Sequence, residues 1–283
     1  MKYLLILMAL LCACVLPAFA QNGNGANKKE IEDMRRESIR ETQKDVNAQK
    51  AESKAAASPA VATAADVGEP DSFGNAARFM GIAGSGVIYV YTSCDPAVLM
   101  TDLGLTLGPD DRCLAAPDPA VTATATFTDI GRINLPAKAN DNILYMINNH
   151  TINYEFENIT GSSVSASMSY SPLITIESVA LNDPAAIDPS TGLPMNGSFT
   201  TGGNGTTTVL QLIPTGSNEI HVSAYSRANT AGFSRTYWAA LGLPQNVIDK
   251  LFKKPMTIRL GARVSVRRVP FGMFLYSARF LGN

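Results

Sequence analysis

The sequence predicts a mostly β protein: an antiparallel β-sandwich or jelly-roll-like domain with one short helix near residues 244–253. Three observations favour this class. Apolar and polar residues alternate with a period of two in several stretches, turn-forming residues separate those stretches, and strands do not alternate with long helices. We expect a signal peptide at 1–20, a charged tether at 21–70 and the β-domain at 71–283.

Strict alternation is the clearest strand signal in the chain. Val121, Ala123, Ala125 and Phe127, for example, alternate with threonines. A strand of this kind places one face against a core and the other in water. The strongest candidates are 121–128, 151–157, 163–170 and 258–267, and further candidates are 86–92, 173–181, 206–213, 220–225 and 274–280.

Turn-forming residues lie between these candidates, and one amphipathic segment interrupts them. The turns fall at 161–162, 183–184, 188–192, 202–205 and 216–218. Pro244 suits the first turn of a helix, and the residues that follow it place their apolar side chains on one side. These side chains are Val247, Ile248, Leu251 and Phe252.

The first twenty residues have the pattern of a secretory signal peptide. Lys2 precedes an apolar run at 4–14, and Ala18-Phe19-Ala20 comes directly before Gln21. The run is too short for the roughly 20 residues that cross a membrane. We therefore expect cleavage after Ala20 and export to the periplasm, the outer-membrane surface or the extracellular space. An alternative is lipidation at Cys14, because residues 11–14 loosely resemble a lipobox.

Removal of the signal peptide leaves two cysteines, Cys94 and Cys113. An even number of cysteines in an oxidising compartment predicts one disulfide bond, which would stabilise the fold by about 3 kcal/mol. Two free buried thiols are the alternative. A metal site needs more ligands than two cysteines and two distant histidines provide. We expect no metal site and no cofactor.

The tether, residues 21–70, differs in composition from the domain. Its charged part, 28–54, contains eight basic and seven acidic residues, and its few apolar residues do not sustain a heptad repeat. We expect a solvated, transient helix followed by an Ala/Pro-rich spacer at 55–62. Two alternatives are a disordered tether and a helix that docks on a partner subunit.

No catalytic motif is present in the sequence. Glu155 and Glu157 lie on one strand face, as paired carboxylates of glycoside hydrolases do, but a solvent-facing surface is the commoner explanation. His150 and His221 lie far apart, and each is interpreted as a surface or capping residue. We therefore expect a protein that is not an enzyme.

Charge is distributed unevenly along the domain. After Asp249 the chain contains eight basic residues and no acidic one. Arg259, Arg263 and Arg267 are four residues apart on one predicted strand, so they would form a basic stripe on one face. We interpret the stripe as a partner-binding surface. The alternative is that these charges pair within the folded domain.

These features predict a non-catalytic protein of the cell envelope or the extracellular space. We expect it to associate with itself, as a homo-oligomer, or with a larger envelope complex through its charge-polarised surfaces. The alternative is a module that binds carbohydrate or an anionic envelope polymer. Nothing in the sequence predicts a nucleic-acid partner.

Overall fold

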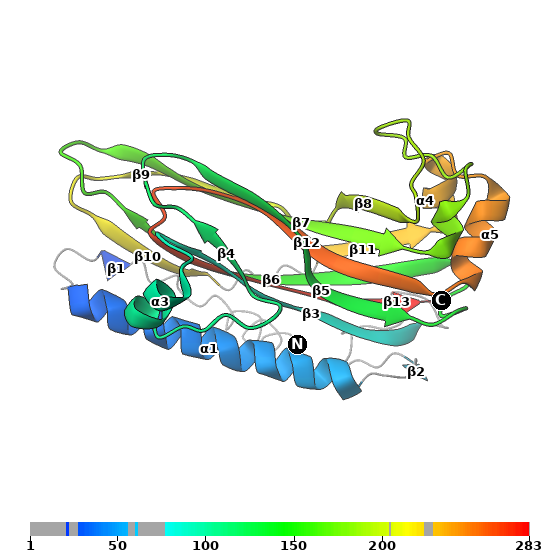
Figure 1. Ribbon diagram of the computed structural model, residues 1–283, viewed down its shortest axis with the longest axis horizontal. Helices are drawn as coiled ribbons and strands as arrows, with labels where there is room; N and C mark the ends of the chain where they lie inside the picture. The colour runs from blue at the N-terminus through cyan, green and yellow to red at the C-terminus, as the bar shows by residue number, and fades with distance from the viewer. Residues whose placement is uncertain are drawn as a thin grey trace, which may run out of the picture.

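The structure, a computed structural model, is mostly β and describes residues 21–22, 28–55, 60–61, 77–203, 205–223 and 229–282. Its strands form two sheets in which antiparallel pairs predominate (Figure 1). The predicted signal peptide and the predicted domain boundary near residue 70 lie outside the described residues. In the part that is described, no helix is both long enough and apolar enough to span a membrane.

Sheet A has three long central strands and five short strands at its edges within the described residues. The central strands, in spatial order, are β6 (Ile143–Glu157), β13 (Phe271–Gly282) and β3 (Arg78–Tyr91). The edge strands are β1 (Gln21–Asn22), β2 (Ala60–Val61), β4 (Arg112–Ala115), β10 (Asn218–Ser223) and β11 (Asn229–Ser234). β10 and β11 pair with opposite halves of β6, and β4 pairs with β3 in parallel.

Sheet B also has three long strands, with two short strands on one edge. In spatial order the long strands are β5 (Ala123–Leu135), β12 (Met256–Arg267) and β7 (Val164–Glu177). The short strands β8 (Ser198–Gly202) and β9 (Thr207–Ile213) pair with opposite halves of β7. The edge of β7 is therefore divided between two partners.

The chain crosses repeatedly between the sheets. In chain order, β3 and β4 (sheet A) are followed by β5 (B), β6 (A), β7 to β9 (B), β10 and β11 (A), β12 (B) and β13 (A). The inward faces of both sheets enclose one apolar core. Its largest fully buried side chains include Trp238, Tyr170, Tyr276, Phe156, Phe274 and Phe280.

Six helical segments accompany the sheets in the described residues. They are α1 (Lys28–Ala55), α3 (Pro96–Val98), the π-helical turn η2 (Leu99–Leu103), the 3-10 turn η3 (Val179–Asn182), α4 (Arg235–Ala240) and α5 (Gln245–Lys253). The predicted helix near 244–253 is confirmed as α5, with its four predicted apolar side chains buried. The short α4, which the sequence reading missed, lies beside it and is joined to it by the ion pair between Arg235 and Asp249, at 2.5 Å.

The predicted strands 163–170 and 173–181 are one strand, β7, although Pro172 lies inside it. The carbonyl of Pro172 accepts a hydrogen bond from the amide of Gly203 at 2.7 Å, so it points toward the edge of β8 and β9. In a strand, the backbone nitrogen of a residue points to the same side as its carbonyl. The nitrogen of Pro172, which has no hydrogen to donate, therefore points to the gap between β8 and β9. Pairing with β12 on the other side is continuous.

The predicted strand 121–128 covers only the first half of β5. Its second half bends toward sheet A at a register shift opposite Leu260 and Ala262. Gly131 lies at this bend, where a β-carbon would come within 2.3 Å of the carbonyl oxygen of Gly84 in β3. Glycine permits this close approach of the two sheets, and the bulge breaks the alternation that identified the first half of the strand.

Candidate interaction surfaces

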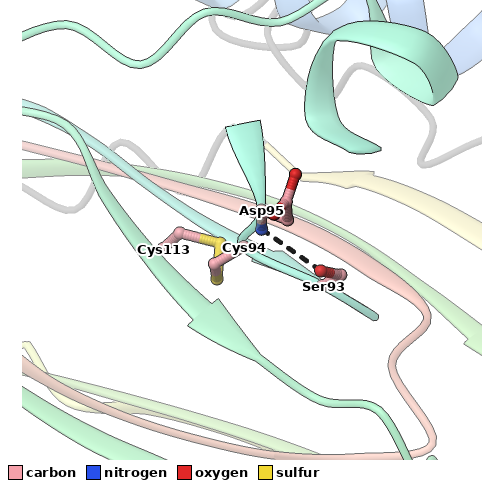
Figure 2. Close-up of a disulfide and its surroundings, with 4 residues drawn as sticks. All are labelled: Ser93, Cys94, Asp95 and Cys113. Carbon is pink, nitrogen blue, oxygen red and sulfur yellow. Dashed lines mark hydrogen bonds between the residues drawn. A yellow bond between two sulfur atoms is a disulfide. The ribbon is translucent and has the colours of Figure 1, made fainter. Parts of the chain in front are cut away.

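The predicted disulfide between Cys94 and Cys113 is present, with an S–S distance of 1.97 Å (Figure 2). It connects the segment after β3 to β4. Asp95, the next residue, caps α3 by accepting a hydrogen bond from the amide of Ala97 at 2.8 Å. The disulfide therefore closes the loop that carries α3 and η2.

This loop packs on the outer face of sheet A. Its side chains Leu99, Leu103 and Leu105 are buried against a group of apolar residues from β3 and β13. We call this outer surface the covered face; it consists of Val87, Tyr89, Tyr91, Phe271, Met273 and Leu275.

Tyr91 joins the covered face to the loop. Its hydroxyl donates a hydrogen bond to Asp102 at 3.0 Å. Burial, and then the neighbouring Asp102 carboxylate, raise the pKa of Tyr91 to about 12. The phenol is therefore held in its neutral, hydrogen-bonding form over a wide range of pH.

Helix α1 lies over the covered face and runs along one side of the molecule (Figure 1). Ile39, Thr42 and Val46 are buried at 4, 4 and 7% exposure. The predicted helix forms, but it is not solvated on all sides, because one side of it packs on the domain. Arg35, Ile39, Thr42 and Val46 follow the 4-3-4 spacing of a helix contact stripe. Two of the four are polar, so a search for apolar periodicity does not find the stripe.

A buried ion pair fixes α1 on sheet A. The guanidinium of Arg35 donates to both carboxylate oxygens of Glu155 in β6, at 2.9 Å from Nε to Oε1 and 2.6 Å from Nη2 to Oε2. The two side chains are 14% and 3% exposed. Burial raises the pKa of Glu155, and Arg35 acts in the opposite direction. The prediction that Glu155 faces solvent is wrong, because α1 covers it.

The predicted basic stripe does lie on one face of β12, the outer face of sheet B. We call this outer surface the open face, because no described helix covers it. Arg259, Arg263 and Arg267 pair across the sheet with Thr175, Ser171 and Ser167 of β7, so they share one side of the strand.

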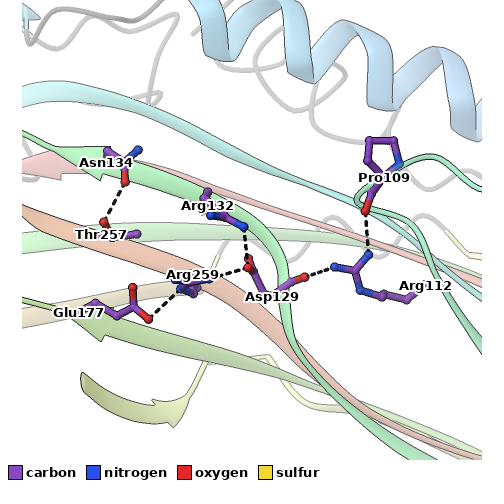
Figure 3. A network of polar contacts seen from close by, with 8 residues as sticks. All are labelled: Pro109, Arg112, Asp129, Arg132, Asn134, Glu177, Thr257 and Arg259. Carbon is purple, nitrogen blue, oxygen red and sulfur yellow. Dashed lines mark hydrogen bonds and ion pairs between the residues drawn. The ribbon is translucent and has the colours of Figure 1, made fainter. Parts of the chain in front are cut away.

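Arg259 differs from the other two arginines because it has partners inside the domain (Figure 3). Its guanidinium contacts Asp129 at 2.6 Å and Glu177 at 2.8 Å, and Asp129 also binds Arg132 at 2.7 Å. The hydrogen bond with Glu177, and then the nearby carboxylates, raise the pKa of Arg259. Arg259 therefore pairs within the folded domain, as the alternative interpretation of the stripe expects.

Arg263 and Arg267 remain available at the surface. Both are exposed. Within the described residues the side chain of Arg263 has no hydrogen bond or ion pair, and that of Arg267 donates only to the carbonyl of Ala120, at 3.1 Å. Hydroxyl groups surround them in cross-strand pairs. These pairs are Thr124–Ser265 at 3.0 Å, Ser169–Thr208 at 3.3 Å and Thr175–Thr200 at 2.8 Å.

Two exposed leucines extend the open face onto β9. Leu210 and Leu212 are 73% and 68% exposed, and Leu210 pairs across the sheet with Ser167, which pairs in turn with Arg267. Their exposure was not predicted, because the segment 206–213 has apolar residues on both faces. Alternation alone does not tell which of the two faces the core.

Three further features of the described residues bear on possible chemistry. They contain no group of three or more His, Cys, Asp or Glu side chains that could hold a metal. A hollow of about 470 Å³ lies beside η3, but its one carboxylate, Glu177, is held by Arg259. His150 was predicted at the surface and is instead buried in the core, with Nε2 3.1 Å from the hydroxyl of Thr207. The side chain of His221 lies outside the described residues.

Comparisons with known proteins add little to this geometry. No protein-family model and no curated protein matches the chain. A solved structure of the Gx strain of infectious bursal disease virus is 9% identical and covers 71% of this chain and 59% of its own, with a TM-score of 0.14. The VP2 subviral particle of the same virus is 11% identical, covers 73% and 65%, and has a TM-score of 0.08. The chain spans less than two thirds of these chains, and such TM-scores carry no argument about fold or function.

Proposed function

We propose that the protein is an exported, non-catalytic structural protein of the cell envelope or the extracellular space, which assembles with itself or with a larger envelope complex. The open face of sheet B is its contact surface. The observation that carries the proposal is the row formed by Arg267, Ser167 and Leu210, in which an exposed cation and an exposed leucine flank a hydroxyl. Exposed apolar groups beside charged ones are typical of surfaces that bind other proteins.

The proposal includes a finer fold, an antiparallel β-sandwich of the jelly-roll type. The strand order supports it. If β10 with β11, and β8 with β9, each count as one interrupted strand, sheet A reads β10/β11–β6–β13–β3 and sheet B reads β8/β9–β7–β12–β5. Such interleaving of early and late strands is what two Greek keys produce in a jelly roll. Jelly rolls form both capsids and lectins, so the fold alone does not decide the function.

Export is part of the proposal and is supported by the disulfide between Cys94 and Cys113. Disulfides persist in secreted proteins and in the periplasm and are rare in the cytosol. The signal-peptide pattern of residues 1–20 points in the same direction.

A second candidate is the binding of an anionic envelope polymer, and one observation favours it. Arg263 has no partner among the described residues and lies amid the cross-strand hydroxyl pairs, an arrangement that could hold phosphate or carboxylate groups along a chain. Neutral carbohydrate is less favoured. None of the aromatic side chains whose exposure is described lies fully at the surface, so the open face offers no ring on which a sugar could stack.

The test measures particle size by light scattering at low and high salt for the wild type and two double variants. We expect salt-sensitive particles from the wild type, and smaller ones from Arg263→Gln/Arg267→Gln and from Leu210→Ser/Leu212→Ser. Lys253→Gln/Lys254→Gln and Leu193→Ser change equally exposed residues elsewhere and serve as matched controls. A wild type that stays monomeric at every salt concentration, yet is retained on an anionic polymer through Arg263, would support the second candidate instead.

A further inference from the structure

The covered face of sheet A and the disulfide-closed loop beside it form an apolar surface, which we call the groove. The disulfide fixes the loop that supplies Leu99, Leu103 and Leu105. The loop is also held from its other end, because Asp111 accepts hydrogen bonds from the amides of Val87 and Gly108, both at 2.8 Å. An apolar surface bordered in this way is a common binding site for a helix.

Helix α1 supplies only a small part of the apolar contact in this groove. Its buried apolar side chains are Ile39 and Val46, whereas the groove contributes six residues from the sheet and three from the loop. The apolar contact therefore does not require that the covering helix belong to the same chain. The specific element is the ion pair, because Glu155 is almost fully buried and requires a cation opposite it.

The length of chain between α1 and β3 does not force α1 to dock on its own domain. β2 pairs with the first residues of β3, so an exchanged α1 takes β2 with it, and residues 62–77 form the connection to β3. Fully extended, these residues span at most roughly 55 Å. The helix itself is roughly 42 Å long. The connection is therefore long enough for α1 to reach the groove of a neighbouring copy.

We propose that the groove on sheet A accepts α1 from a second copy of this chain, so that copies exchange their helices within an assembly. This inference rests on the proposed self-assembly and identifies a segment that joins the copies. A short tether gives the helix an effective concentration in the millimolar range at its own groove. Dilute protein therefore keeps its own helix, and exchange dominates only where copies are crowded or the internal contact is blocked.

Two charge reversals block the internal contact and leave the exchanged one intact. In Arg35→Glu the helix repels its own Glu155, and in Glu155→Arg the groove repels its own Arg35. When both variants are mixed, each helix finds an opposite charge only in the groove of the other variant. We expect the two, expressed together with different affinity tags, to co-purify at least tenfold more than a tagged wild-type pair at the same dilution.

Matched controls separate charge from exchange. Arg36→Glu with Glu157→Arg reverses charges next to the ion pair and should give no increase in co-purification. Arg35→Glu/Glu155→Arg in one chain restores the internal contact and should protect α1 from protease without association. If this double variant protects α1 while the mixed single variants stay apart, α1 docks only on its own domain and the proposal is overturned.

A second measurement covers the possibility that Glu155→Arg does not fold. A labelled synthetic peptide of residues 28–55 should bind to the Arg35→Glu protein, whose groove is intact, and at least tenfold more weakly to the wild type. The same peptide carrying Arg35→Glu should not bind, and equal binding of both peptides would overturn the proposal. If the mixed variants associate but the wild type never forms particles, the proposed assembly is overturned and the exchange is not.

Discussion

The outer faces of the two sheets differ in chemistry, and the difference follows from three strands. On sheet A, β3 and β13 have apolar side chains on both faces, so the outer one requires a cover, which α1 and the disulfide-closed loop provide. On sheet B, β12 alternates buried apolar residues with threonine, serine and arginine. That face is stable in water without a cover. A strand that is apolar on both sides predicts a third layer, and an alternating strand predicts a free surface.

The two faces also use charge differently. The ion pair between Arg35 and Glu155 is buried and holds a helix in place, whereas the network around Arg259 is partly exposed and ties neighbouring strands together. Buried pairs are costly to break, and exposed pairs contribute little to stability.

Removal of the disulfide should have the largest effect. Cys94→Ala/Cys113→Ala should lower the free energy of unfolding by about 3 kcal/mol, because the loop of the unfolded chain is no longer closed. The loss should be accompanied by faster hydrogen exchange in α1, whose groove the loop helps to form. Denaturant unfolding and exchange measured by mass spectrometry check both results. Normal protection of α1 in the variant would show that the groove does not depend on the disulfide.

Removal of the buried cation should have the next largest effect, and it should be local. Arg35→Ala leaves Glu155 without its partner, which should lower the opening free energy of α1 by about 2 kcal/mol, since the helix can lift and admit water. Lys44→Ala, on the exposed side of the same helix, should change it by less than about 0.5 kcal/mol. Limited proteolysis within residues 28–55 measures the opening. Equal cleavage of the two variants would contradict the assigned role of the ion pair.

High pH should loosen the covered face in a defined window. Because the pKa of Tyr91 is raised from 10.0 to about 12, the neutral phenol stabilises the folded state. This contribution is fully present below pH 10 and is lost as the pH rises from 10 through 12. Tyr91→Phe should remove one phenol from the late part of the alkaline absorbance titration, near pH 12. Loss of a phenol that titrates near pH 10 instead would show that Tyr91 is exposed.

The sequence predicted the coarse fold and the disulfide, and it failed where side chains act across distances that no local pattern encodes. The alternation of apolar and polar residues predicted the strands that have one solvent-exposed face. β11, however, pairs with β6 through Ala231 and Gly232, which carry no strand signal. The contact stripe of α1 includes Arg35 and Thr42, which become buried only because sheet A offers Glu155 and an apolar groove. Likewise, the partners of Arg259 come from β5 and β7, so only the sheet order reveals them.

The smallest expected effect separates two neighbouring arginines of the same strand. Arg259→Gln removes the cation shared by Asp129 and Glu177, and should lower the free energy of unfolding by about 1 kcal/mol. Arg263→Gln removes no described contact and should change stability by less than about 0.5 kcal/mol. Assembly should show the opposite order, because Arg263 can reach a partner whereas Arg259 is held within the domain. Denaturant unfolding and light scattering on the same two samples make the comparison. If Arg259→Gln weakens assembly as much as Arg263→Gln does, the internal network and the contact surface are one site, and the contrast drawn between them fails.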